Sequence, residues 1–218
     1  KELMLQHVHL QNRFIYYLTG RRIEALRSSP LLERCLDLGY DALLLTDPVD
    51  EVAASFLTEY EGKPFRSLEV EDALPDARED TREKPSELAV FLKEALGSLV
   101  KDVRLSTRLT SSPACLVGDK EDSSFAMERI LRSMGQTPPP VQRILEINGD
   151  HPVLRGLERR LADADRAERE ELKEYAFLLY DQCVLAEGGQ LDDPGTFARR
   201  VSRLMDRSLA GEDDLKTP

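Results

Sequence analysis

The chain has 218 residues, enough for one large domain or two ordinary ones with a sizeable buried core. Its 30 basic and 41 acidic residues give a formal net charge of −11. That balance argues against a nucleic-acid partner, because such proteins present clustered Lys and Arg to the phosphates. The longest apolar runs, residues 42–45 and 176–179, are far shorter than the roughly 18 residues that cross a bilayer, so we expect no membrane partner.

The cysteines and the first residues bear on where the protein works. Cys35, Cys115 and Cys183 are odd in number and widely spaced, so neither a disulfide framework nor a zinc site is indicated. A reducing, cytoplasmic compartment fits best. The chain starts at Lys1 and residues 3–10 lack the apolar core of a signal peptide, so we expect a piece of a longer protein.

The first 60 residues predict a small αβα layer. Residues 13–19 are rich in Ile, Tyr and Phe and predict a buried strand, and apolar residues at helical spacing over 30–38 predict a helix. Residues 41–46 predict an interior parallel strand. Residues 47–60 predict a second helix, which would bury Val49, Ala53, Phe56 and Leu57.

An acidic segment follows this layer. Residues 69–83 carry seven Asp and Glu against two Arg, with Pro75 inside, and such a stretch lacks the apolar area needed to order itself. We therefore predict a linker here and a domain boundary near residue 75, giving domains 1–75 and 76–218.

The second part predicts a mixed or antiparallel sheet with helices. Ser86 caps a helix, and residues 123–134 form another before Gly135. Strands are predicted near 103–107, at 114–117 and at 143–148. Three helices end the chain, and their approximate ranges are 152–161, 167–187 and 194–209. The fold class is α+β.

Several segments share one resemblance. Residues 47–65 (DPVDEVAASFLTEYEGKPF) resemble the late middle domain of the 90-kilodalton heat-shock chaperone family, whose bacterial members are called HtpG. Residues 100–113 (VKDVRLSTRLTSSP), 144–151 (ILEINGDH) and 181–194 (DQCVLAEGGQLDDP) resemble the same family in the same order. The likeness spans residues 14–209, and it implies the end of the middle domain followed by the C-terminal dimerisation domain.

The resemblance also implies what this chain does not do. The family binds ATP and Mg in an N-terminal domain, which precedes the matched region, so we expect no cofactor and no enzymatic activity in this chain. The residues agree, because Gly188, Gly189 and Gly195 lie in a helical hairpin rather than after a strand, and no nucleophile and base can be paired. His7 and His9 alternate without a third ligand nearby, so no metal site is predicted.

The helix predicted at 123–134 is the candidate client-binding element. Its apolar side chains are Phe125, Met127, Ile130, Leu131 and Met134. Met and aromatic side chains on a helix with polar flanks suit adaptable binding, while core packing remains the alternative. The resemblance implies that the equivalent helix touches unfolded or partly folded client proteins. Val52 stands where bacterial members often carry a tryptophan implicated in client contact.

The last two helices are the candidate dimer interface. Both carry apolar residues at i, i+3, i+4 and i+7. These stripes could cover the rest of their own domain, or they could pack against a symmetry mate and form a dimeric four-helix bundle. The predicted interface residues are Leu172, Tyr175, Ala176, Leu179, Cys183, Ala186, Phe197, Val201, Leu204 and Met205.

The sequence thus predicts a chaperone fragment that forms a homodimer and binds clients, with co-chaperones as further partners. The rival hypothesis is a stand-alone dimeric adaptor or a small-molecule enzyme of α+β build.

Overall fold

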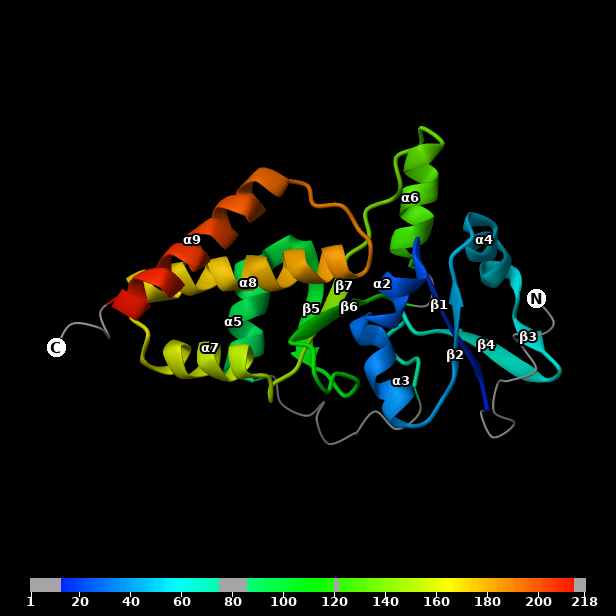
Figure 1. Cartoon of the computed structure of the whole chain (residues 1–218), viewed down its shortest axis with the longest axis horizontal. Coiled ribbons are helices and arrows are strands. Elements are labelled where there is room, and N and C mark those ends of the chain that lie inside the picture. The colour runs from blue at the N-terminus through cyan, green and yellow to red at the C-terminus, as the bar shows by residue number, and fades with distance from the viewer. Residues whose placement is uncertain (1–12, 75–85, 120–121, 214–218) are drawn as a thin grey trace.

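The computed structural model describes residues 13–74, 86–119 and 122–213, which form two sheets with helices around them (Figure 1). The predicted α+β class is confirmed. The elements of the first part are β1 (Ile15–Thr19), α2 (Ile23–Arg27), the 3-10 turn η1 (Pro30–Leu32), α3 (Glu33–Asp37), β2 (Ala42–Leu45), α4 (Pro48–Phe56), β3 (Glu59–Tyr60) and β4 (Lys63–Ser67).

The first sheet has the strand order β2-β1-β4-β3. β1 is parallel to both β2 and β4, as expected for strands joined through helices. Side chains alternate along β1, so Tyr16 and Leu18 pack against α2, η1 and α3 while Tyr17 and Thr19 point to the opposite face. The prediction of an interior strand at 41–46 was wrong in one respect. β2 is parallel, but among the described residues it pairs with β1 alone, and it is only half-buried.

α4 differs from its predicted length and face. It ends at Phe56 because Glu59 and Tyr60 instead pair with β4, in a hairpin whose turn residues Glu61 and Gly62 have φ of 50° and 75°. Among the described side chains of α4, Ala54 is buried, whereas Phe56 is 80% exposed. Val49, Ala53 and Leu57 are exposed as well, so the face predicted to be buried faces outward.

The second part begins with α5, whose N-cap Ser86 accepts a hydrogen bond from the Ala89 N–H at 3.1 Å, as predicted. Its elements are α5 (Glu87–Leu96), η3 (Gly97–Leu99), β5 (Val100–Leu105), β6 (Ala114–Val117), α6 (Phe125–Ser133), β7 (Arg143–Ile147), α7 (Pro152–Asp163), α8 (Arg166–Ala186) and α9 (Pro194–Asp213). β7 is central, parallel to β5 and antiparallel to β6, which confirms a mixed sheet.

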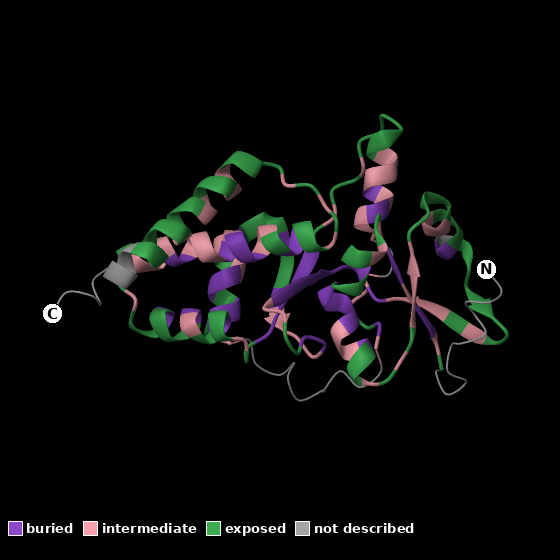
Figure 2. Ribbon diagram, in the orientation of Figure 1, coloured by how far each residue is buried: buried purple, intermediate pink, exposed green. Residues whose placement is uncertain are grey.

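The second sheet is covered on both faces, and its strands β6 and β7 are buried throughout (Figure 2). Leu116 and Leu145 point into a core shared with α5, α7 and α8. Cys115, Val117 and Ile144 point the other way, into the core that contains Tyr16 and Leu18 of the first sheet together with η1 and α3. The two parts of the chain therefore share one apolar layer.

The start of the acidic segment is folded, contrary to the prediction of a linker from residue 69. Leu68 and Ala73 are fully buried. Gly118 N–H donates to the Glu69 carbonyl at 2.9 Å and Glu71 N–H donates to the Gly118 carbonyl at 3.0 Å. Backbone pairing with the end of β6 thus orders residues whose side chains are mostly acidic. Residues 75–83, the boundary near residue 75 and residues 1–12 lie outside the described part.

Candidate functional site

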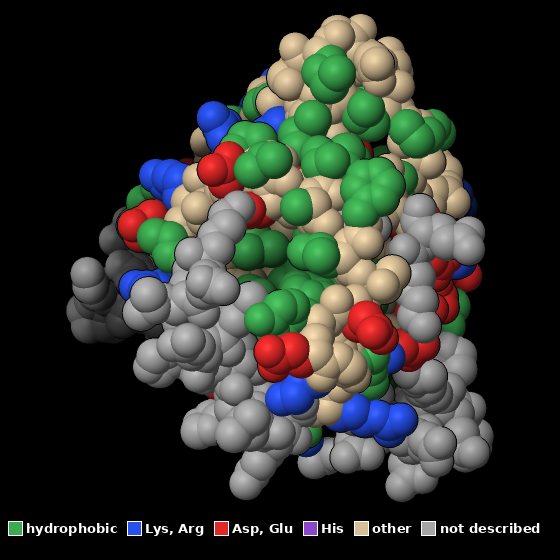
Figure 3. Space-filling view, turned by 90° about the vertical axis from the view of Figure 1, so that its right-hand side faces the viewer, with side chains coloured by type: hydrophobic (Ala, Val, Ile, Leu, Met, Phe, Trp, Pro, Cys, Tyr) green, Lys and Arg blue, Asp and Glu red, His purple; other side chains and the backbone are tan. Residues whose placement is uncertain are grey.

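Large apolar side chains lie exposed around α4 and the outer end of α6. Figure 3 shows hydrophobic side chains gathered over the upper half of this face. A contiguous exposed apolar patch on a protein usually marks an interaction site. We call the following set the α4–α6 surface: Val49, Val52, Phe56, Leu57, Tyr60 and Met134.

The five apolar residues predicted on α6 differ in how far they are exposed. Met134 is 67% exposed at the tip, where α6 stands out from the molecule (Figure 1). Met127, Ile130 and Leu131 are half-buried along the helix. Phe125 packs against the core that contains α8, and the Arg143 guanidinium lies 3.6 Å above the centre of its ring. Phe125 therefore anchors α6 and is not part of the exposed surface.

A cavity of about 550 Å³ separates α4 from the base of α6. Its floor is the outer face of the first sheet, with Tyr17, Thr19 and Ser67, and Met127 forms part of its wall. A second cavity of about 540 Å³ lies between the ends of β1 and β2 and α6, lined by Ile130. Met127 and Ile130 thus face open space beside the α4–α6 surface.

Glutamates enclosed between the two parts give this region an unusual charge state. Burial raises the pKa of Glu69 to about 8, and the nearby Glu51 carboxylate adds to the shift. Thr19 Oγ1 donates to Glu69 Oε1 at 3.3 Å. Burial likewise raises the pKa of Glu187 to about 8, with Glu69 as the second cause. Both carboxyl groups therefore favour the protonated form more than an ordinary glutamate does.

Ser124 connects α6 to α4. Its hydroxyl donates to Glu51 Oε1 on α4 and accepts from the Met127 N–H at 2.9 Å, which caps the first turn of α6. Glu51 Oε2 is buried and has no hydrogen-bond partner among the described residues. One serine thus ties the start of α6 to the helix on the other side of the cavity.

The terminal hairpin does not present all of its predicted interface residues. Leu172, Ala176, Leu179 and Cys183 are at most 4% exposed and pack in the core of the same chain, so they offer no surface to a second chain. Tyr175 packs at the edge of that core. The apolar stripe of α8 is therefore buried within the chain. This corrects the prediction that Leu172, Ala176, Leu179 and Cys183 are interface residues.

α9 keeps an apolar surface that its own chain does not cover. Met205 is exposed, as are Ala186 at the end of α8 and Leu209. The predicted residues Phe197, Val201 and Leu204 are half-buried.

Ion pairs that the sequence analysis missed hold α9 on α8. Arg200 contacts Glu174 at 3.1 Å and Asp181 at 3.5 Å, and Arg203 contacts Glu174 at 2.7 Å. Arg207 pairs with Glu171 in the same groove. Arginines spaced three and four residues apart on α9, facing an acidic α8, were the available signal.

Comparison with known proteins identifies the family. The model of the Hsp90 protein family matches residues 4–218. The chain belongs to the Hsp90 family. Relatives named "Chaperone protein HtpG" include that of Mycobacterium bovis, which is 45% identical over 205 residues covering 89% of this chain and 31% of the relative. The HtpG of Rhodococcus jostii is 42% identical over 89% of this chain and 32% of its own length, and that of Magnetococcus marinus is 42% identical over 88% and 31%.

These matches confirm the predicted resemblance to bacterial HtpG. The chain spans about a third of the length of the curated relatives it matches. In this Hsp90 chain the exposure of Val49, Phe56 and Leu57 was not predicted, because apolar spacing on α4 is equally typical of a buried face.

Two further observations concern metal-binding clusters and membrane-spanning helices. Within residues 13–74, 86–119 and 122–213 of this Hsp90 chain, no group of three or more His, Cys, Asp or Glu is arranged to hold a metal ion. No described helix combines the length and the apolar character that crossing a membrane requires.

Proposed function

We propose that this chain is the part of an ATP-dependent, HtpG-type chaperone that provides constitutive homodimerisation and part of the surface for unfolded or partly folded clients. The observation that supports client binding best is the α4–α6 surface, where Phe56 and Met134 are largely exposed on neighbouring elements. Val52 belongs to this surface, and the half-buried residues Met127, Ile130 and Leu131 of α6 extend it. Nucleotide turnover, with ATP and Mg, belongs in this proposal to the rest of the protein, as do co-chaperone contacts.

The chemistry of this surface suits clients without a fixed sequence. Unfolded proteins expose varied apolar side chains, and burying them gains roughly 25 cal/mol per Å². Methionine is flexible and polarisable, so Met127 and Met134 can adapt to different partners, which is how promiscuous binding surfaces work. Two helices on either side of a cavity add room for side chains of different size.

Homodimerisation is proposed through α9. Its outward residues Met205 and Leu209, with Leu204, Val201 and Phe197 beside them, form a stripe on a helix already held in place by ion pairs. A preformed helix loses little freedom on association, so burying this stripe against its symmetry mate favours a dimer. The α8–α9 hairpins of the two chains would together form a four-helix bundle.

Client binding is tested by measuring whether the chain, in the absence of nucleotide, suppresses the aggregation of an unfolded protein. The Phe56→Ser/Met134→Ser variant should weaken binding of a permanently unfolded protein at least fivefold and leave the melting temperature within about 2 °C, because both side chains are exposed. Leu36→Ser on α3, where the side chain is 58% exposed, is the matched control and should change neither quantity. Equal binding by all three proteins would contradict the proposal, and nucleotide turnover by the chain alone would favour the rival enzyme.

A further inference from the structure

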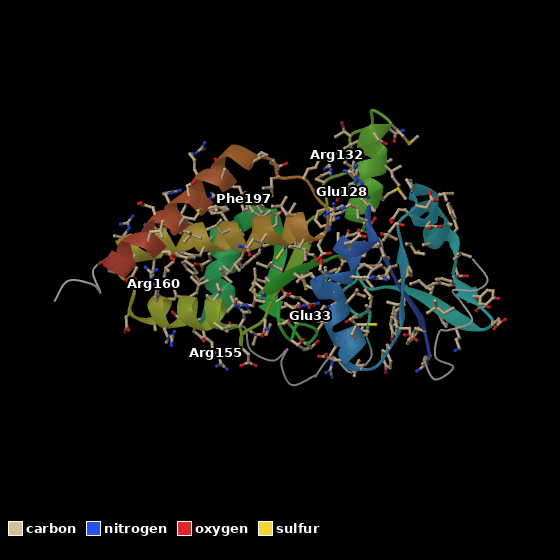
Figure 4. The ribbon with its side chains drawn as sticks, viewed as in Figure 1. Glu33, Glu128, Arg132, Arg155, Arg160 and Phe197 are labelled. Carbon is tan, nitrogen blue, oxygen red and sulfur yellow. The ribbon has the colours of Figure 1, made fainter. Side chains whose placement is uncertain are left out.

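The lower half of α6 is built around Arg143 of β7. Arg143 Nη2 donates to Glu128 Oε1 and to the Ser123 carbonyl, both at 2.7 Å. The side chains of Arg143 and Glu128 are only 10% and 8% exposed, and the Arg143 guanidinium also covers the Phe125 ring. Figure 4 places Glu128 and Arg132 on the flank of α6 that faces α8 and α9. A buried, well-aligned pair of this kind fixes a helix strongly.

The turn after α8 presses on the same ring. Gly188 has a φ of 77°, which turns the chain, and Gly189 N–H then donates to the Val184 carbonyl at 2.8 Å. A Cβ on Gly189 would lie 2.9 Å from two ring atoms of Phe125 and 2.8 Å from Val184 Cγ1. Gly189 does not have a positive φ, so what requires glycine here is the close approach of the Phe125 ring and the Val184 side chain.

The far end of α6 depends on this base for its direction. Ser133 and Met134 are exposed, and the tip projects from the body of the molecule (Figure 1). A helix of nine residues is about 13 Å long, so a tilt of about 10° at its base moves the tip by about 2 Å. A shift of Phe125 is thereby amplified at Met134.

We propose that Gly189, Phe125 and Arg143 form a seat that sets the direction of α6, so that Gly189 and Arg143 are positioning residues for client binding; this rests on the proposed function. The turn between α8 and α9 contributes none of the residues that define the α4–α6 surface, yet through the seat it determines the direction of α6. Arg129 Nη1, which donates to the Gly188 carbonyl at 3.4 Å, adds a second contact between α6 and the same turn.

The test replaces Gly189 with alanine in the full chain. Gly156→Ala is the matched control, because a Cβ on Gly156 of α7 has nothing within 4 Å. Affinity for reduced, carboxymethylated α-lactalbumin is measured by fluorescence anisotropy, and amide hydrogen exchange is followed along α6. Gly189→Ala should bind at least fivefold more weakly, and residues 130–134 should exchange at least tenfold faster. Gly156→Ala should match the parent in both measurements.

A second substitution separates positioning from general damage. Phe125→Leu in the Gly189→Ala background removes the two ring atoms that lie 2.9 Å from the new methyl group and leaves Val184 Cγ1 as the remaining close contact, so this double variant should bind more tightly than Gly189→Ala. Phe125→Leu alone should speed exchange in α6 without loss of folding, and this keeps the test decisive if Gly189→Ala does not fold. If every variant that folds exchanges its α6 amide hydrogens at the rate of the parent, the proposed role of the seat is wrong. A parent chain that fails to bind the unfolded probe would instead refute the proposed function, while the exchange data would still decide about the seat.

Discussion

Arg108 and Glu146 form an ion pair at 3.0 Å in which each side chain is only 5% exposed. Arg108 also donates to the carbonyl groups of Leu68 at 2.9 Å and Val70 at 3.1 Å, in the segment that follows β4. Glu146 lies on the central strand β7 of the second sheet. One buried guanidinium therefore ties the end of the first sheet to the middle of the second.

Removing this guanidinium should destabilise the chain strongly. Arg108→Met removes one of the two guanidinium groups that pair with Glu146, which keeps Arg104 and Ser106 as partners. It also removes the donor shared by the carbonyls of Leu68, Val70 and Glu71, so we expect a loss of about 3 kcal/mol in the free energy of unfolding. Urea denaturation followed by circular dichroism measures the change. The control is Arg155→Met, which breaks the exposed pair with Asp150 and should cost less than about 1 kcal/mol. Similar losses in both variants would contradict the structural role of Arg108.

A second connection between the two parts is made by Glu33 at the start of α3, beside the loop between β5 and β6 (Figure 4). Its carboxylate accepts from the N–H groups of Thr110, Ser111 and Ser112 at 2.6 to 2.9 Å. Burial alone would raise the pKa of Glu33, but these hydrogen bonds outweigh it and hold the pKa below its ordinary value.

Glu33→Ala should release that loop. The amides of residues 110–112 should exchange at least tenfold faster than in the parent, while Glu24→Ala, at an exposed position on α2, should leave them unchanged. Because the native pKa of Glu33 is lowered, its contribution to stability is present above the ordinary pKa of about 4.3 and is lost as the pH falls below it. The stabilities of the parent and Glu33→Ala should therefore converge in acid, and a constant difference between them would count against the carboxylate.

The raised pKa of Glu69 predicts the opposite dependence of stability on pH. Its pKa is about 8 in the folded chain and about 4.3 when unfolded, so between these values the native state holds a proton that the unfolded chain lacks. Stability should therefore fall as the pH rises through this window, by at most about 1.4 kcal/mol per pH unit for one group. Glu187 acts with the same sign.

Glu69→Gln should remove part of that dependence. The variant should match the parent in urea denaturation near pH 5 and exceed it near pH 9, because glutamine cannot ionise. Glu59→Gln on the exposed strand β3 is the control and should follow the parent at both values. A Glu69→Gln variant that loses stability with pH as steeply as the parent would show that another group is responsible.

The two sides of the terminal hairpin should respond differently to charge. Met205→Glu/Leu209→Glu changes exposed residues and should halve the mass measured by light scattering at micromolar concentration, with the helix content retained. Leu179→Glu places a charge in the core, where the residue is 4% exposed, and should unfold the second part of the chain instead. Lys173→Glu, on the exposed side of α8, should do neither. A monomeric parent would remove the basis for the dimer.

Local patterns were sufficient to locate most of the elements. The strands β1, β6 and β7 and the helices α5 to α9 lie where apolar spacing and capping residues predicted them, because these signals act within a few residues of each other. Ser86 is such a signal, since it caps the helix that follows it. The family likeness was likewise carried by short segments that can be recognised without a structure.

Apolar spacing along the chain specifies which residues of a helix share a face, but the packing of distant elements specifies what that face contacts. Leu179 of α8 and Phe56 of α4 both belong to apolar stripes, yet Leu179 is buried by its own chain while Phe56 is exposed. Ala73 is buried in an acidic segment because the backbone around Gly118 lies beside it. Hydrophobic periodicity is a property of neighbours in sequence, whereas burial depends on contacts between elements that are far apart in the chain.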